Sequence, residues 1–201
     1  MVEKIVVPAI YNAIEAGDTV QLKLTINEFP DYIDYITPFA GGTWLHYAAR
    51  QGNIKVVNCL LDLGFDPNKV DSLDGGLPIV RASHGAHVDV VLRLLRAGSC
   101  LEVSGADSAS NPLFAAIQGG SIEIVKTFLD AGIDTSRTYG EKDNIDALAF
   151  AILYGQTEIA QVLALHKANN NPSDAESLIL QAKEAIKPIG GLKQVKILPD
   201  T

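Results

Sequence analysis

The fold of this chain is decided by the stretch TWLHYAARQGNIKVVNCLLDLGFDPN, residues 43–68. It predicts two short helices, because apolar residues recur at helical spacing on both sides of one glycine and a second glycine follows. The stretch also recurs: positions equivalent to Thr43 lie at Pro8, Leu77, Asn111 and Asp146, at intervals of 34 or 35 residues. A fixed period of about 20–50 residues indicates a solenoid of stacked units.

Each unit repeats the same small residues at the places where helices approach or turn. The sixth position is an alanine, which lets neighbouring helices come close, in Ala13, Ala48, Ala82, Ala116 and Ala151. The glycine between the two helices recurs as Gly17, Gly52, Gly120 and Gly155, and is displaced to Gly85 and Ala86 in the third unit. A further glycine ends the second helix in Gly64, Gly98 and Gly132. In the fifth unit we expect Asn169 or Asn170 to take this left-handed position.

The second helices carry paired apolar positions, such as Val56 and Val57 followed by Leu60 and Leu61. This spacing predicts one buried face on each second helix. One unit alone cannot offset its chain entropy, whereas a stack of five can.

The repeated unit resembles the ankyrin repeat, which opens with Thr-Pro-Leu-His-x-Ala. Residues 43–48 keep that opening except for the proline, which is Trp44 here, while the third and fourth units keep the proline and lose the histidine. The resemblance covers residues 8–170. It implies an all-α ankyrin-repeat solenoid of about five helix-turn-helix units, near 8–42, 43–76, 77–110, 111–145 and 146–170. It also implies that His46 bonds backbone between units.

Both ends of the solenoid are expected to differ from the repeat. Residues 31–36 replace a short loop in the first unit, and two interpretations stay open for them, a helical turn or a strand-like finger. After a solenoid domain over 1–172, residues 173–201 predict a capping helix and a short tail. Ser173, with Glu176 three residues on, is the expected N-cap.

Composition and charge limit the classes of partner. The net charge of −8 argues against nucleic acid or an anionic membrane and suits a basic protein. The N-terminus lacks the pattern of a secretory signal, and no run reaches the ~18 apolar residues of a membrane span, so we expect a cytoplasmic protein. Cys59 and Cys100 form no disulfide framework. We expect the free chain to be a monomer.

Catalytic and metal chemistry find little support in the sequence. His84, His87 and Asp89 are the strongest metal candidates, but zinc requires three or four converging ligands. His87 falls at the turn between two helices, where a capping role is expected instead. We therefore expect no enzyme activity, no catalytic residue, no metal and no cofactor, and keep a metal-dependent enzyme around these three residues as the alternative from another class.

The resemblance instead implies a partner-binding surface along the concave side. The expected finger-tip residues are Phe39, Leu73, Asp74, Asp107, Ser108, Lys142 and Asp143. The expected inner-helix residues are Arg50, Gln51, His84, Gln118, Leu153 and Tyr154. Trp44 lies at the base of the second finger and has two interpretations: it fills the space of the missing proline, or it anchors a partner as tryptophan often does.

The sequence therefore predicts a protein–protein interaction module. Small ankyrin-like proteins of this kind resemble bacterial immunity proteins, which block a toxin by occlusion, so we expect the partner to be a basic toxin that acts in the cytoplasm. An effector or a regulatory adaptor is the alternative within binding proteins.

Overall fold

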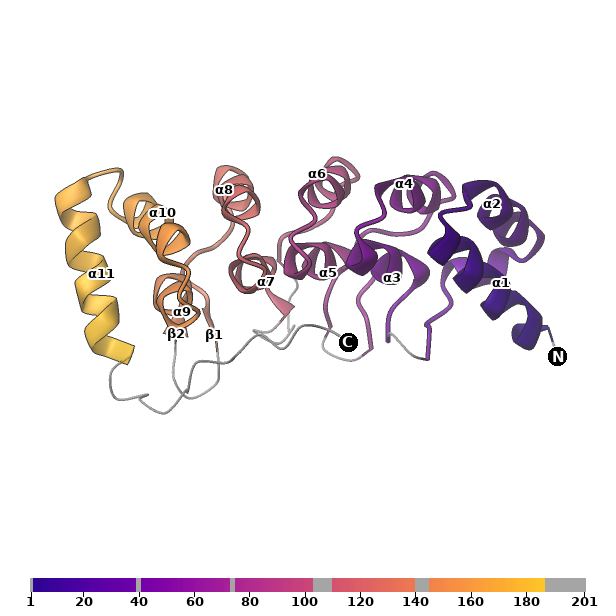
Figure 1. The fold of residues 1–201 in the computed structure, drawn as a ribbon, viewed down its shortest axis with the longest axis horizontal. Coiled ribbons are helices and arrows are strands. Elements are labelled where there is room, and N and C mark those ends of the chain that lie inside the picture. The colour runs from indigo at the N-terminus through magenta and orange to yellow at the C-terminus, as the bar shows by residue number, and fades with distance from the viewer. Residues whose placement is uncertain (1, 39–40, 73–74, 103–109, 140–144, 187–201) are drawn as a thin grey trace.

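The structure is a computed structural model that describes residues 2–38, 41–72, 75–102, 110–139 and 145–186. Within these residues, five helix-turn-helix pairs stack side by side in two rows, and one more helix closes the row (Figure 1). The predicted all-α solenoid of five units with a C-terminal capping helix is confirmed. The division into domains at residue 172 stays a prediction.

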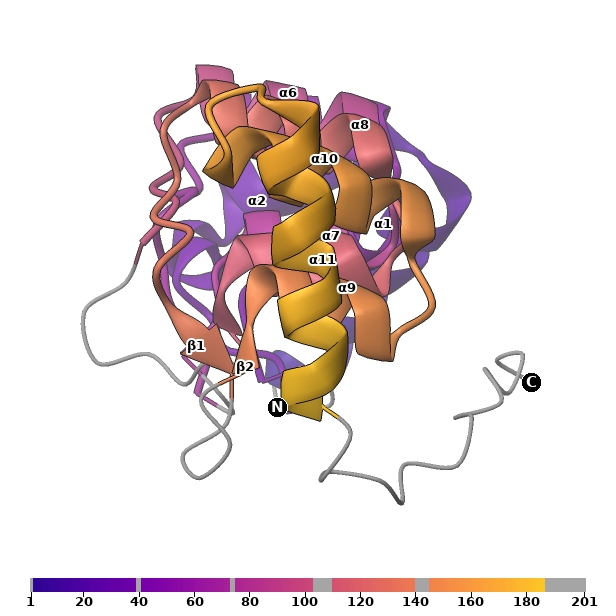
Figure 2. The same ribbon diagram turned by 90° about the vertical axis from the view of Figure 1, so that its left-hand side faces the viewer.

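The first helices of the pairs form an inner row and the second helices an outer row (Figure 1). The inner row is α1 (Glu3–Ala16), α3 (Trp44–Gln51), α5 (Pro78–His84), α7 (Pro112–Gln118) and α9 (Ala147–Leu153). The outer row is α2 (Thr19–Glu28), α4 (Ile54–Asp62), α6 (Val88–Arg96), α8 (Ile122–Asp130) and α10 (Thr157–Lys167). The closing helix α11 (Pro172–Ile186) lies across the end formed by α9 and α10 (Figure 2).

One continuous apolar core runs between the two rows. The alanines at the sixth position of units two to five are fully buried, as are Val56, Val57 and Leu60 of α4. Neighbouring units contact each other through this core. For example, the rings of Phe114 in α7 and Phe150 in α9 pack edge to face, with 5.0 Å between their centroids. Each fully buried apolar side chain contributes roughly 1.5–3 kcal/mol, so the stack is stable although a single pair is not.

The turns follow the predicted positions. In the third pair the left-handed residue is Ala86, with φ 56°, and not Gly85. In the fifth pair both candidates are left-handed, with φ 48° at Asn169 and 64° at Asn170. The outer helix of the third unit therefore begins at the predicted place although no left-handed glycine precedes it. The free-energy cost of one left-handed alanine is small compared with the gain from the apolar surface that the helix pair buries.

At both ends of the stack the helix boundaries differ from the predicted ones. Helix α1 begins at Glu3, so Pro8 lies inside it. The reason is that the apolar spacing continues upstream, since Val6 and Ile10 are both buried. Helix α11 begins at Pro172, and its cap is Asn171, whose side chain accepts from the Ser173 backbone N–H at 3.1 Å. The prediction of Ser173 as N-cap is therefore wrong.

The segment before the second unit contains a 3-10 helix, η1 (Pro30–Ile33), so the helical-turn interpretation is the correct one. Extended backbone appears instead between the fourth and fifth units, where β1 (Thr138–Tyr139) pairs antiparallel with β2 (Ile145–Asp146). Across the described part of the chain, none of the helices combines the length and apolar character needed to cross a bilayer.

Candidate partner-binding surface

The predicted inner-helix residues lie at equivalent places of successive units. Arg50 and Gln51 end α3, His84 ends α5, Gln118 ends α7, and Leu153 ends α9 with Tyr154 as its C-cap. Arg50, Gln51, His84 and Tyr154 are exposed, and Gln118 and Leu153 are half-buried. Together they form the inner-helix surface, a row of exposed or half-buried side chains, of which Leu153 also packs against the core.

The predicted finger-tip residues lie outside the described residues. They are Phe39, Leu73, Asp74, Asp107, Ser108, Lys142 and Asp143. Their role in binding stays a prediction.

The structure brings two of the predicted residues together at the C-terminal half of the surface. The side-chain amide of Gln118 donates to the hydroxyl of Tyr154, with 2.9 Å between the two atoms. The Tyr154 ring also packs on Phe150, with the centroids 4.5 Å apart, yet 45% of the tyrosine remains exposed. A tyrosine held in one orientation by its neighbours is the kind of residue that dominates binding energy at interfaces.

A second cluster lies at the N-terminal half and includes residues that sequence reasoning missed. The Tyr47 hydroxyl donates to Glu15 at 2.7 Å, and Gln51 donates to the Tyr47 hydroxyl at 3.0 Å. The rings of Tyr11 and Tyr47 lie 5.6 Å apart. Burial, and then the hydrogen bond to Glu15, raises the pKa of Tyr47. The missed signal was spacing, because Tyr47 lies one helical turn before Gln51 and shares its face.

Trp44 does not belong to this surface. Its side chain is fully buried, and its ring stacks on Tyr35 with 6.2 Å between the centroids. The interpretation of Trp44 as an exposed anchor for a partner is therefore wrong. The indole begins α3 and turns inward beneath the residues that follow η1, where it forms part of the core.

Two histidines form hydrogen bonds that hold the inner helix α3 in place. The ring of His46 accepts from the Thr43 backbone N–H at Nδ1, over 3.1 Å, so its Nε2–H donates to the Gly76 carbonyl over 3.2 Å. Gly76 is the last residue of the second unit, so this bond lies within that unit and is not the contact between units that the ankyrin resemblance implies. His87 Nε2 lies 2.9 Å from the carbonyl of Arg50 and thereby caps α3 of the preceding unit. Among the described residues, no three His, Cys, Asp or Glu side chains converge as metal ligands.

The buried position of His46 predicts a pH dependence of stability. Burial lowers the pKa of His46 below its ordinary value of 6.5. The unfolded chain therefore binds a proton before the folded protein does, and stability falls as the pH drops below 6.5 towards the lower folded pKa. Urea titrations at about pH 7.5 and about pH 5.5 measure this loss. We expect His46→Gln to lose part of the difference between the two pH values, and the exposed-site control His84→Gln to keep it.

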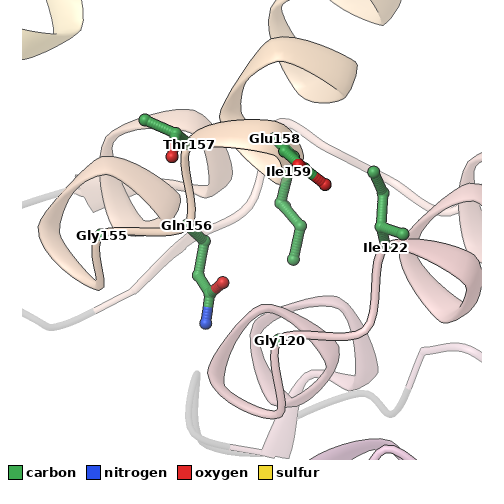
Figure 3. Close-up of a pocket in the computed structure, with 7 residues that line it drawn as sticks. All are labelled: Gly120, Ile122, Gly155, Gln156, Thr157, Glu158 and Ile159. Atoms are coloured by element: carbon green, nitrogen blue, oxygen red, sulfur yellow. The ribbon is translucent and has the colours of Figure 1, made fainter.

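A shallow hollow separates the turns of the fourth and fifth pairs (Figure 3). It measures about 220 Å³ and is lined by Gly120, Ile122, Gly155, Gln156, Thr157, Glu158 and Ile159. Figure 3 shows Gln156 and Ile159 reaching from the fifth unit towards the turn at Gly120. Small-molecule sites are usually larger, about 300–1,000 Å³, and have converging polar groups. The hollow is therefore a junction between units.

Stacked helix pairs, left-handed turn residues and the contact of His87 with the preceding unit define a helical repeat protein. Comparison with family models agrees: a model of ankyrin repeats in many copies matches residues 45–95, and a model of three ankyrin repeats matches residues 79–174. The chain belongs to the ankyrin-repeat family. Solenoids of this family are protein–protein interaction modules, which is therefore the general function of this chain.

Curated relatives of this chain come from a nematode, a virus and an alga. An ankyrin repeat and KH domain-containing protein of Caenorhabditis briggsae is 30% identical over 165 residues, which are 81% of this chain and 6% of the relative. A putative ankyrin repeat protein of fowlpox virus is 29% identical over 126 residues, 63% of this chain and 85% of the relative. Zygote-specific protein 3 of Chlamydomonas reinhardtii is 35% identical over 108 residues, 54% of this chain and 27% of the relative. The chain thus spans only a small part of the Caenorhabditis protein.

Proposed function

We propose that the chain binds a partner protein on its inner-helix surface. The observation that carries this proposal is a contrast between positions. At the buried sixth position, units two to five all have alanine, whereas the ends of the same four inner helices carry Arg50 and Gln51, His84, Gln118, and Leu153 and Tyr154. Positions that differ from unit to unit on one face of a solenoid are suited to recognition rather than to packing.

The partner we propose is a basic toxin that acts in the cytoplasm, and the chain is its immunity protein, which blocks the toxin by occlusion. The net charge of −8 supports this, because an acidic inhibitor and a basic target associate fast. Glu15 lies at the N-terminal half of the inner row and gives that half a negative group beside Tyr47. The likeness to immunity proteins is one of fold, so this part of the proposal rests on charge and analogy.

Replacing the exposed Tyr154 tests the inner-helix surface. We expect Tyr154→Ala to weaken partner binding by about 2 kcal/mol, roughly 30-fold, as for an interface hot spot. Because Tyr154 is 45% exposed, the melting temperature should change little. Capture from native cell extract, quantified by mass spectrometry for wild type and variant, measures the effect.

The matched control is Lys126→Ala on the outer helix α8, an exposed position that should leave capture unchanged. Equal capture by Tyr154→Ala and wild type would remove the inner-helix surface as the binding site. The toxin assignment is tested separately by co-expression with a toxin encoded beside this gene. Survival that depends on Tyr154 supports an immunity protein, and death of protected and unprotected cells alike refutes it.

A further inference from the structure

The carboxylate of Glu15 is held in one orientation without being neutralised. It is exposed, and its Oε1 accepts from the Tyr47 hydroxyl over 2.7 Å and from the Gln51 side-chain amide over 3.4 Å. Both donors are uncharged. Within the described residues, no ion pair includes Glu15 and no hydrogen bond reaches its Oε2. One oxygen therefore fixes the carboxylate, and the other can accept a hydrogen bond from another molecule.

Arg50, the residue before Gln51 in α3, leaves this negative charge uncompensated. Its side chain is exposed, and in the part of the chain that the structure describes it forms no ion pair with Glu15. The carboxylate of Asp146, in contrast, is paired with Lys167 over 2.6 Å. Glu15 is therefore a negative group for which the described chain supplies no counter-charge.

Two tyrosine rings lie beside this carboxylate. Tyr11 and Glu15 are one turn apart on α1 and share a face of the helix, and Tyr47 approaches from α3, the next inner helix (Figure 1). The centroids of the two rings are 5.6 Å apart, and their planes are tilted by 35°. Both tyrosines are half-buried, so each packs partly on the core and keeps part of its surface towards solvent. A tyrosine ring attracts a cation that lies within about 6 Å of its centroid.

This combination selects a guanidinium among the groups that a protein can present. A guanidinium is planar and carries five N–H donors, so it can stack on a tyrosine ring while it donates to a carboxylate. An ammonium is a compact, strongly hydrated point charge and gains less from a ring face. An anion is repelled by Glu15, and an apolar group would bury the carboxylate without a partner, which is costly.

We propose that Tyr11, Glu15, Tyr47 and Gln51 receive an arginine side chain of the partner protein, and we call these four residues the arginine site. This inference rests on the proposed function and names the group that the basic partner presents to the first two units. The guanidinium donates to Oε2 of Glu15 and lies against the tyrosine rings. Tyr47 and Gln51 act as positioning residues, because they hold the carboxylate by its other oxygen.

Nuclear magnetic resonance titration of the isolated chain tests the arginine site without the partner. The probe is N-acetyl-arginine methylamide, and its neutral analogue N-acetyl-citrulline methylamide is measured at equal ionic strength. We expect the arginine probe to shift the backbone amide signals of Glu15, Tyr47 and Gln51, with a dissociation constant on the order of 10 mM. The citrulline probe should leave these signals unchanged.

Three variants locate the binding. Glu15→Gln keeps an oxygen that can accept from Tyr47 but removes the charge, and it should weaken binding of the arginine probe at least about tenfold. Tyr47→Phe keeps the ring and removes the hydroxyl that orients the carboxylate, so it should weaken binding about threefold. The matched control is Glu123→Gln on α8, which removes one exposed negative charge from the outer row and should bind as the wild type does. Circular dichroism verifies that each variant is folded.

Several results would overturn the arginine site. They are signals that do not saturate by about 100 mM probe, equal shifts from both probes, unchanged binding in Glu15→Gln, and an equal loss in Glu123→Gln. Each leaves the inner-helix surface intact as a binding site, because partner capture by Tyr154→Ala tests that surface separately. Conversely, unchanged capture by Tyr154→Ala would remove the proposed surface while the arginine probe still binds.

Discussion

Trp44→Ala is expected to lower the free energy of unfolding by about 3–5 kcal/mol, as removal of a large buried aromatic side chain does. The side chain is fully enclosed by the core of the first two units and stacks on Tyr35. Alanine would leave a cavity that the flanking helices cannot fill without moving. Because Trp44 is the only tryptophan, urea unfolding is best followed by circular dichroism rather than by fluorescence.

The exposed aromatic residue Tyr154 provides the comparison. Tyr154→Ala should lower the free energy of unfolding by less than about 1 kcal/mol, since its removal opens no internal cavity. If Trp44→Ala were as stable as wild type and lost partner binding instead, Trp44 would be a surface anchor after all and the structure around α3 would be wrong.

Gly52→Ala is expected to destabilise the protein by about 2–4 kcal/mol, for two reasons that add. Gly52 has φ 71°, which is costly for alanine, and a Cβ atom there would lie 2.3 Å from Nδ1 of His87. The ring cannot move aside without losing its hydrogen bond to the Arg50 carbonyl. Urea midpoints of variant and wild type measure the loss.

The control variant Gly98→Ala separates the cost of the left-handed backbone from the cost of the clash with His87. Gly98 has φ 85°, but a Cβ atom there would meet nothing within 4 Å. This variant should lose only the cost of the left-handed backbone, about 1–2 kcal/mol. Equal losses in the free energy of unfolding for Gly52→Ala and Gly98→Ala would show that His87 does not pack closely against Gly52 of the preceding unit. The contact of His87 would then contribute nothing to the stability of the stack.

The repeat architecture could be predicted because its determinants are local and recur. Turn glycines at Gly17 and Gly52, buried alanines and paired apolar positions each have a physical reason within one unit, and the period multiplies the signal. Even the substitutes were predictable, since Asn169 and Asn170 are the residue type that most readily replaces glycine in a left-handed position.

The missed features depend on how one unit faces the next. The position of Trp44 in the helical pattern did not reveal whether the indole turns towards the core or the groove. Tyr35, which follows η1, stacks on the indole and so helps to enclose it. The cluster of Tyr11, Glu15 and Tyr47 joins two inner helices, and its contacts follow from the spacing of α1 and α3.

The central claim is that the inner-helix surface is where another protein binds, and site-specific photo-crosslinking in native cells tests it most directly. A photoreactive amino acid placed at Gln118, at the end of inner helix α7, should form a covalent adduct with the partner. The same amino acid at Lys126, on outer helix α8, should form none. Adducts from Lys126 and not from Gln118 would show that the partner binds the opposite face and would contradict the account.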